Sequence, residues 1–90
     1  MIARTKVEVV NERGLHARAS AKFVRLAGEF DAEVTVSRDD QTVDARSIMG
    51  LMMLAAGPGC ILTISAEGRQ ATEVVEALKR LVESRFEEDR

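Results

Sequence analysis

The chain contains a single histidine, His16, and the residues around it are unusual for the beginning of a helix. Helices generally begin with a capping Ser, Thr, Asp or Asn and carry acidic side chains in their first turn. Here Arg18 falls in the first turn of an alanine-rich segment, Arg13 lies just upstream, and the next acidic residue is Glu29. A cation at the positive end of a helix is unfavourable by roughly 0.3–1 kcal/mol. The pattern therefore predicts a phosphate site, with free backbone N–H groups and an arginine beside a nucleophilic imidazole.

A plainer interpretation of His16 stays open at this point. A lone histidine near the start of a helix is commonly a surface residue or a weak cap, with no chemical role. The two arginines and the absence of a competing acid in the first turn favour the anion site. These residues alone do not decide between the two interpretations.

Length and composition restrict the classes of protein to which the chain can belong. The 90 residues, of which 46% are hydrophobic and 31% charged, are enough for one domain with a single core. The net charge of −2 argues against a general nucleic-acid binder, which needs a basic face. No apolar run approaches the roughly 20 residues of a membrane span, and the beginning of the sequence lacks the apolar stretch of a signal peptide. We therefore expect a single cytoplasmic domain over residues 1–90, with no membrane or nucleic-acid partner.

Two other features of the sequence are expected to have structural roles only. Cys60 is the only cysteine, so no intrachain disulfide is possible, and with one histidine a structural zinc site is not expected. We expect Cys60 to be a buried strand residue, and we expect no metal or organic cofactor. The acidic residues 87–89 are predicted to form a solvated, frayed end.

Hydrophobic periodicity predicts an alternation of strands and helices. Patterns typical of strands occur at 5–10, 33–37, 42–45 and 60–66. Helical spacing of apolar residues, or a short apolar run, occurs at 17–30, 48–54 and 71–82. The order β-α-β-β-α-β-α predicts an α+β fold, a two-layer open-faced sandwich. We expect a four-stranded antiparallel sheet with three helices on one face and water on the other.

The apolar run at 48–54 is too short for periodicity to separate helix from strand. Ser47 in a capping position and the turn residues 57–59 favour a short helix. Its apolar side chains cannot all face inward, so some apolar surface must be exposed, formed by members of the set Ile48, Met49, Met52 and Met53. Methionine suits a surface that must fit several partners.

Two stretches of the chain resemble HPr, the family of histidine-containing phosphocarriers of the bacterial phosphotransferase system. Residues 14–18 (Gly-Leu-His-Ala-Arg) match the family's phosphorylation-site motif. Residues 46–52 (Arg-Ser-Ile-Met-Gly-Leu-Met) match its regulatory-serine and docking segment. The spacing between the stretches fits, and the predicted order of elements covers essentially the whole chain. On the two motifs together, the chain is identified as a member of this family.

The resemblance implies a phosphoryl relay, in which the protein is a carrier and not an enzyme with its own turnover. Phosphorylated enzyme I passes a phosphoryl group, derived from phosphoenolpyruvate, to His16, and the carrier hands it to a IIA-type domain. In the family, Nδ1 of the histidine accepts the group. Phosphoryl transfer depends mainly on positioning and charge stabilisation, which first-turn amides such as that of Ala17 and the Arg18 guanidinium would supply.

The same resemblance gives Ser47 a role beyond capping, as the site of a regulatory kinase and phosphorylase in members that have them. It also implies that Ile48, Met49 and Met52, together with Arg18, contact enzyme I and the acceptor. A phosphate on Ser47 would add about −1.5 to −2 charges beside this apolar surface at pH 7. We therefore expect Ser47 phosphorylation to affect docking rather than folding, and we expect the carrier to be a monomer.

Ala19 departs from the family's pattern, because proline is common after the arginine of the motif. Alanine preserves the helix with slightly less rigidity and adds an N–H group. We interpret the chain as a variant carrier, and Ala19 hints at the nitrogen-related branch of the system. Two other classes stay open. One is a regulatory module that acts mainly by phosphorylation-dependent binding of target proteins, and the other is a small-molecule-binding α+β domain.

Overall fold

The structure is a computed structural model that describes residues 1–89. Strands and helices follow in the order β-α-β-β-α-β-α, as predicted, and a short 3-10 turn, η1, comes last. The elements are β1 (Ile2–Glu8), α1 (Ala17–Ala27), β2 (Glu33–Arg38), β3 (Gln41–Asp44), α2 (Ile48–Met53), β4 (Ile61–Glu67), α3 (Ala71–Glu83) and η1 (Arg85–Glu87).

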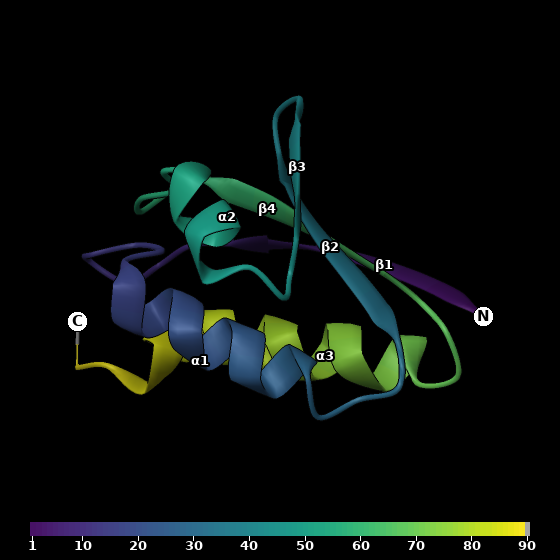
Figure 1. The fold of residues 1–90 in the computed structure, drawn as a ribbon. Coiled ribbons are helices and arrows are strands. Elements are labelled where there is room, and N and C mark those ends of the chain that lie inside the picture. Colours follow the sequence, from purple (N-terminus) through teal and green to yellow (C-terminus); the bar gives the residue numbers. More distant parts are fainter. Residues whose placement is uncertain (90) are drawn as a thin grey trace.

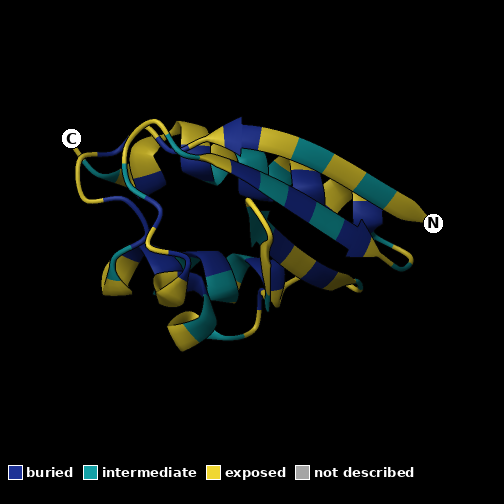
Figure 2. Cartoon of the chain, turned by 90° about the horizontal axis from the view of Figure 1, so that it is seen from above, coloured by how far each residue is buried: buried dark blue, intermediate teal, exposed yellow. Residues whose placement is uncertain are grey.

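The strands form one antiparallel four-stranded sheet in the order β1-β4-β2-β3 (Figure 1). Ile64 in β4 pairs with Thr5 of β1 on one side and with Val36 of β2 on the other. Buried and accessible residues alternate along the strands (Figure 2), because successive side chains point to opposite faces of a sheet. The predicted α+β open-faced sandwich is confirmed.

Helices α1 and α3 lie side by side against the buried face of the sheet (Figure 1). Phe23 of α1 and Leu78 of α3 are fully buried. Burial of each such side chain stabilises the fold by roughly 1.5–3 kcal/mol. The shorter α2 packs beside α1 and contributes Leu51 to the same core. Among residues 1–89, no helix is both long and apolar enough to cross a membrane.

Some predicted boundaries were wrong. β1 begins at Ile2 rather than Thr5, because its pairing with β4 extends back to Ile2, opposite Glu67. α1 ends at Ala27 rather than at residue 30, where Gly28 closes the last turn. Cys60 is only partly buried and precedes β4, because its amide donates a 3.1 Å hydrogen bond to Gly57 within the turn.

In the segment after α3, the prediction of a solvated, frayed end at 87–89 was wrong for Glu88, which is held against His16, whereas Glu87 and Asp89 are exposed. Phe86 lies within η1 and is fully buried. Arg85, Phe86 and Glu87 all have positive φ, at 61°, 55° and 64°. This left-handed conformation costs an L-residue roughly 1–2 kcal/mol. The burial of Phe86 offsets part of that cost, and the segment turns back toward the start of α1 (Figure 1).

Candidate functional site

A tight loop between β1 and α1 sets the position of His16. Gly14 has a φ of +62°, and a β-carbon there would stand 2.1 Å from the Ala56 carbonyl oxygen. The position therefore requires glycine. The amide of Leu15 donates a 2.9 Å hydrogen bond to the same oxygen, and the buried Ser20 hydroxyl donates to the Leu15 carbonyl at 3.1 Å. Both the amide and the carbonyl of Leu15, the residue before His16, are therefore held by hydrogen bonds.

His16 is the N-cap residue of α1, which places the imidazole at the start of its helix. Its carbonyl accepts the Ser20 amide at 2.9 Å, but its side chain makes no capping hydrogen bond. The N–H groups of a first helical turn have no acceptor inside the helix. Within residues 1–89, no hydrogen bond satisfies the amides of Ala17, Arg18 and Ala19, and no acidic side chain lies in this turn. Free amides at the positive end of a helix can bind an anion.

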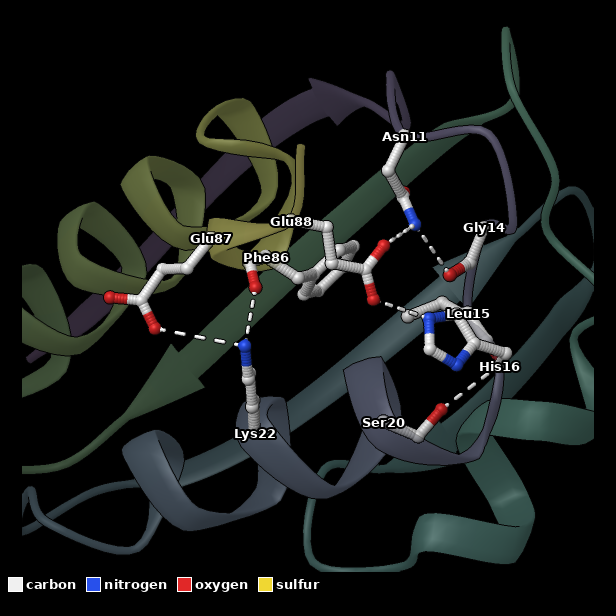
Figure 3. A network of polar contacts seen from close by, with 9 residues as sticks. All are labelled: Asn11, Gly14, Leu15, His16, Ser20, Lys22, Phe86, Glu87 and Glu88. Carbon is white, nitrogen blue, oxygen red and sulfur yellow. Dashed lines mark hydrogen bonds and ion pairs between the residues drawn. The ribbon is translucent and has the colours of Figure 1, made fainter. Parts of the chain in front are cut away.

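The imidazole of His16 contacts the carboxylate of Glu88 (Figure 3). The distance from Nε2 to Oε2 is 2.5 Å, and only 21% of the His16 side chain and 17% of the Glu88 side chain are exposed. The other carboxylate oxygen of Glu88 accepts a 3.2 Å hydrogen bond from Nδ2 of Asn11, which also donates to the Gly14 carbonyl at 3.0 Å. One ring nitrogen is thus engaged, and Nδ1 takes no part in this contact.

The charge of Glu88 is stabilised by its neighbours. Burial raises the pKa of Glu88, but the hydrogen bonds from His16 and Asn11 outweigh that effect and hold the pKa below its usual value. Lys22 contributes to the same lowering through its charge. Glu88 is therefore a carboxylate anion at neutral pH, and it can only accept hydrogen bonds.

Lys22 also fastens the segment after α3 to α1. Its Nζ donates a 2.7 Å hydrogen bond to the Phe86 carbonyl and lies 3.9 Å from the exposed Glu87 carboxylate (Figure 3). Phe86 is thus held both by the burial of its ring and by a hydrogen bond to its carbonyl. These two contacts place Glu88, the next residue but one, against the start of the helix.

Arg18 is exposed on the outer side of the first turn. Within the described part of the chain it makes no hydrogen bond or ion pair, so its guanidinium is available to an anion. A shallow recess beside it has charged side chains of both signs, from Glu12, Arg13, Arg18, Glu88 and Asp89. Glu88 links this recess to the imidazole, because it lines the recess with Arg18 and also contacts the His16 ring. The predicted Ala17 amide is the first N–H of the same helix.

The second predicted segment lies beside α1 on α2. The Ser47 hydroxyl accepts a 2.8 Å hydrogen bond from the Gly50 amide, so the prediction that Ser47 caps this helix is confirmed. The apolar residues Ile48, Met49, Met52 and Met53 are between 41% and 73% exposed and line one apolar groove. We call these four residues the α2 surface. The predicted exposure of apolar side chains on this helix is confirmed.

Sequence reasoning missed Asn11 and Glu88 as members of the site. Asn11 is fully buried, which is uncommon for a polar side chain without a structural or functional partner. The sequence contained a signal for the segment but none for Glu88 itself, because Phe86 is an isolated aromatic residue within a charged segment. Such a residue indicates an anchor, and an anchored segment does not fray.

Comparison with known proteins assigns the chain to a family. The family model described as "PTS HPr component phosphorylation site" matches residues 3–84. The chain belongs to the HPr family of phosphotransferase-system phosphocarriers. The phosphocarrier protein HPr of Cupriavidus necator is 50% identical over 80 residues, which cover 89% of this chain and 90% of that protein. A phosphocarrier protein NPr from Shewanella violacea is 40% identical over 83 residues, covering 92% and 91%.

Solved structures agree with this assignment. The crystal structure of HPr-C-His from Thermoanaerobacter tengcongensis superposes with a TM-score of 0.92 at 40% identity, covering 98% of this chain and 99% of that one. A second structure from the same organism, described as an HPr dimer, has a TM-score of 0.76 at 43% identity, covering 91% and 94%. Since a related HPr forms a dimer in that crystal, the expectation of a monomer stays a prediction for this chain.

Proposed function

We propose that this HPr-family protein accepts a phosphoryl group from phosphorylated enzyme I on His16 and donates it to a IIA-type domain. The observation that carries the proposal is the position of the imidazole, at the N-cap of α1 beside unsatisfied first-turn amides. A nucleophile and an anion-binding helix start occur together here. This combination is what phosphoryl transfer between side chains requires.

Two groups of the first turn would stabilise the transferred phosphate. The amide of Ala17 is the first N–H of α1, and helix N-termini favour negative charge. Arg18 carries a guanidinium that no other described residue binds, and a charge-assisted hydrogen bond from it would strengthen as charge moves to the phosphate oxygens. Neither group needs a metal or an organic cofactor to act in this way.

The α2 surface is proposed as the docking site for enzyme I and the IIA-type acceptor. Ile48, Met49 and Met52 are 41%, 73% and 43% exposed, and their helix packs directly against α1. Flexible methionine side chains can repack against more than one partner. One carrier surface could therefore serve both the donor and the acceptor of the relay.

Ser47 is proposed as a regulatory phosphorylation site for a kinase and a phosphorylase. Its hydroxyl already lies at the start of α2, where added negative charge is compatible with the helix. The effect would fall on docking, because Ile48 and Met49 of the α2 surface follow directly in the chain. The relay starts from phosphoenolpyruvate, a cytoplasmic metabolite, so we propose a cytoplasmic location.

A second candidate function rests on the same α2 surface. A regulatory module would use its exposed apolar groove mainly to bind target proteins, with phosphorylation of His16 controlling the affinity. Ala19 in place of the proline common in the family leaves room for such a divergent role. In that case phosphate would reach His16, but transfer from His16 to a IIA-type domain would be slow.

Incubation with phosphoenolpyruvate and enzyme I, followed by mapping of the modified residue, tests the proposal. We expect an acid-labile, alkali-stable phosphate on His16, followed by rapid loss to a IIA-type domain. His16→Ala should abolish labelling while the protein stays folded, because this side chain lies outside the core cluster. Only the stability contributed by its hydrogen bond to Glu88 should be lost. An unlabelled protein, or a label only on a hydroxyl side chain, would overturn the relay.

A further inference from the structure

The contact between His16 and Glu88 restricts where the imidazole proton can lie. A neutral imidazole carries one proton, on either Nδ1 or Nε2, and the nitrogen without it is an acceptor with a free lone pair. Nε2 lies 2.5 Å from a carboxylate oxygen, which only accepts hydrogen bonds. The proton therefore belongs on Nε2, because without it the lone pair of Nε2 would point at a lone pair of the carboxylate oxygen and the two would repel. The free lone pair is then on Nδ1.

The carboxylate is held in place independently of the histidine. Asn11, which is fully buried, donates to its second oxygen at 3.2 Å. The buried Phe86 ring and the hydrogen bond from Lys22 to the Phe86 carbonyl fix the backbone just before Glu88. The left-handed run at Arg85–Glu87 costs free energy, and these contacts are what maintain it. Such a segment presents the carboxylate to the ring as a fixed acceptor.

We propose that Glu88 is a positioning residue of the phosphoryl acceptor, which orients the His16 ring and keeps its proton on Nε2 so that Nδ1 can attack. This inference rests on the proposed phosphocarrier function and adds a residue to its machinery. Glu88 does not touch the phosphate in this arrangement. It acts through the imidazole, as orienting carboxylates act on catalytic histidines in other proteins.

The transfer step balances without removing a proton from the attacking atom. The lone pair on Nδ1 forms the new N–P bond while the bond between phosphorus and the donor atom of phosphorylated enzyme I breaks. The electron pair of the broken bond returns to the donor atom. The proton stays on Nε2, so the ring becomes positively charged next to the Glu88 carboxylate, which stabilises that charge. Onward transfer returns the N–P electron pair to Nδ1 and leaves the ring neutral again.

Nuclear magnetic resonance of protein labelled with ¹⁵N tests the positioning without any phosphoryl transfer. In the unphosphorylated protein above neutral pH, the ¹⁵N shifts should place the proton of His16 on Nε2. The hydrogen bond to Glu88 should slow exchange of this proton with water enough for its resonance to be observed at low temperature. Glu88→Ala should lose the resonance, and Glu88→Gln should keep it in weakened form, because the amide oxygen can still accept. A proton on Nδ1, or an Nε2 resonance unchanged in Glu88→Ala, would overturn the proposal.

Rates of phosphorylation by enzyme I give the second measurement. Glu88→Ala should lower the rate about tenfold, because the imidazole loses one hydrogen bond to a charged group that stabilises it during transfer. Glu87→Ala is the matched control, because it removes the same charge from the same segment but its carboxylate does not contact the ring. Circular dichroism would verify that both variants are folded. Equal rates in the two variants would overturn the role of Glu88 in transfer.

The two measurements separate this inference from the proposed function. If the natural protein accepts no phosphate at all, the relay fails, and the resonance experiment still decides whether Glu88 positions the ring. If the natural protein is labelled on His16 but both Glu88 variants match it in rate and resonance, the relay stands and the positioning role is wrong.

Discussion

The amide of Leu15 donates a 2.9 Å hydrogen bond to the carbonyl of Ala56, joining the loop before α1 to the turn after α2. His16 is the next residue along the first loop, and the α2 surface lies on the helix before the second. This hydrogen bond therefore connects the backbone beside the proposed phosphoryl acceptor to the element proposed to dock its partners. Rigid elements hold reacting groups more closely than mobile loops do.

Substitution at Gly14 should break this connection. In Gly14→Ala the new methyl group would overlap the Ala56 carbonyl oxygen at 2.1 Å, on a residue that already has a φ of +62°. We expect a loss of at least about 2 kcal/mol in the free energy of unfolding, together with slower phosphorylation of His16. Urea denaturation and the enzyme I assay would measure the two effects.

Gly57→Ala is the control for that substitution. Gly57 lies on the other side of the same contact, but a β-carbon there meets no atom within 4 Å. Its stability should stay within about 0.5 kcal/mol of the natural protein. Equal effects of the two substitutions would show that the Gly14 contact does not determine the loop.

Removal of the Arg18 guanidinium should slow phosphorylation without unfolding the protein. In Arg18→Ala we expect a rate lower by about tenfold, because one charge-assisted hydrogen bond to the phosphate is lost. The loss should shrink at high salt, since exposed charges are screened. Arg25→Ala removes the same charge from the last turn of the same helix and should leave the rate unchanged. A similar decrease in both variants would indicate a general charge effect instead of a phosphate contact.

Ser47→Asp should separate the structural and regulatory roles of this residue. Aspartate caps helices as well as serine does, so α2 should remain folded. The new negative charge beside the α2 surface should slow phosphorylation by enzyme I, mainly through a higher KM. Steady-state kinetics over a range of enzyme I concentrations would measure it.

Ser47→Ala should show the opposite pattern. The hydrogen bond to the Gly50 amide disappears, and the free energy of unfolding should fall by about 1 kcal/mol. No charge is added, so the KM for enzyme I should change little. An unchanged KM in Ser47→Asp would contradict the proposed charge effect on docking.

The stability contribution of Glu88 should depend on pH. Its pKa in the folded protein lies below the ordinary value of 4.5, so the folded state favours the carboxylate. The resulting stabilisation is complete above the unfolded-state pKa and is lost as pH falls through the folded-state pKa. The difference in unfolding free energy between the natural protein and Glu88→Gln should therefore shrink on acidification. Urea denaturation from about pH 7 down to about pH 3 tests this, and a constant difference would contradict it.

Local patterns in the sequence were sufficient to predict the elements and several of their details. The spacing of apolar residues reflects which face of each element is buried, as at Phe23, at Leu78 and along the alternating strands. This spacing was therefore enough to predict the order of the elements and their arrangement in two layers. The N-cap of α2 depends on a hydrogen bond between residues three positions apart, Ser47 and Gly50, and was predicted for the same reason. The exposed α2 surface followed from having more apolar side chains than one short helix can bury.

Strand and helix ends were less accurate because they depend on contacts that the alternation of residues within one strand does not reveal. The start of β1 depends on a partner distant in the sequence, since pairing with Glu67 extends the strand back to Ile2. The start of β4 depends on a local turn, since the hydrogen bond from Cys60 to Gly57 keeps Cys60 out of the strand. The spacing of apolar residues identifies which side chains face the core, whereas pairing with the neighbouring strand decides at which residue a strand begins or ends.

The sequence by itself determined that a histidine, an arginine and a row of free amides meet at one helix start, because these groups are neighbours along the chain. Only the tertiary structure decided that Glu88, 72 residues away, lies against the imidazole. That contact depends on the burial of Phe86 in the common core and on the left-handed turn at Arg85–Glu87. Packing between distant segments has no local spacing rule, so the carboxylate became visible only when the chain was folded.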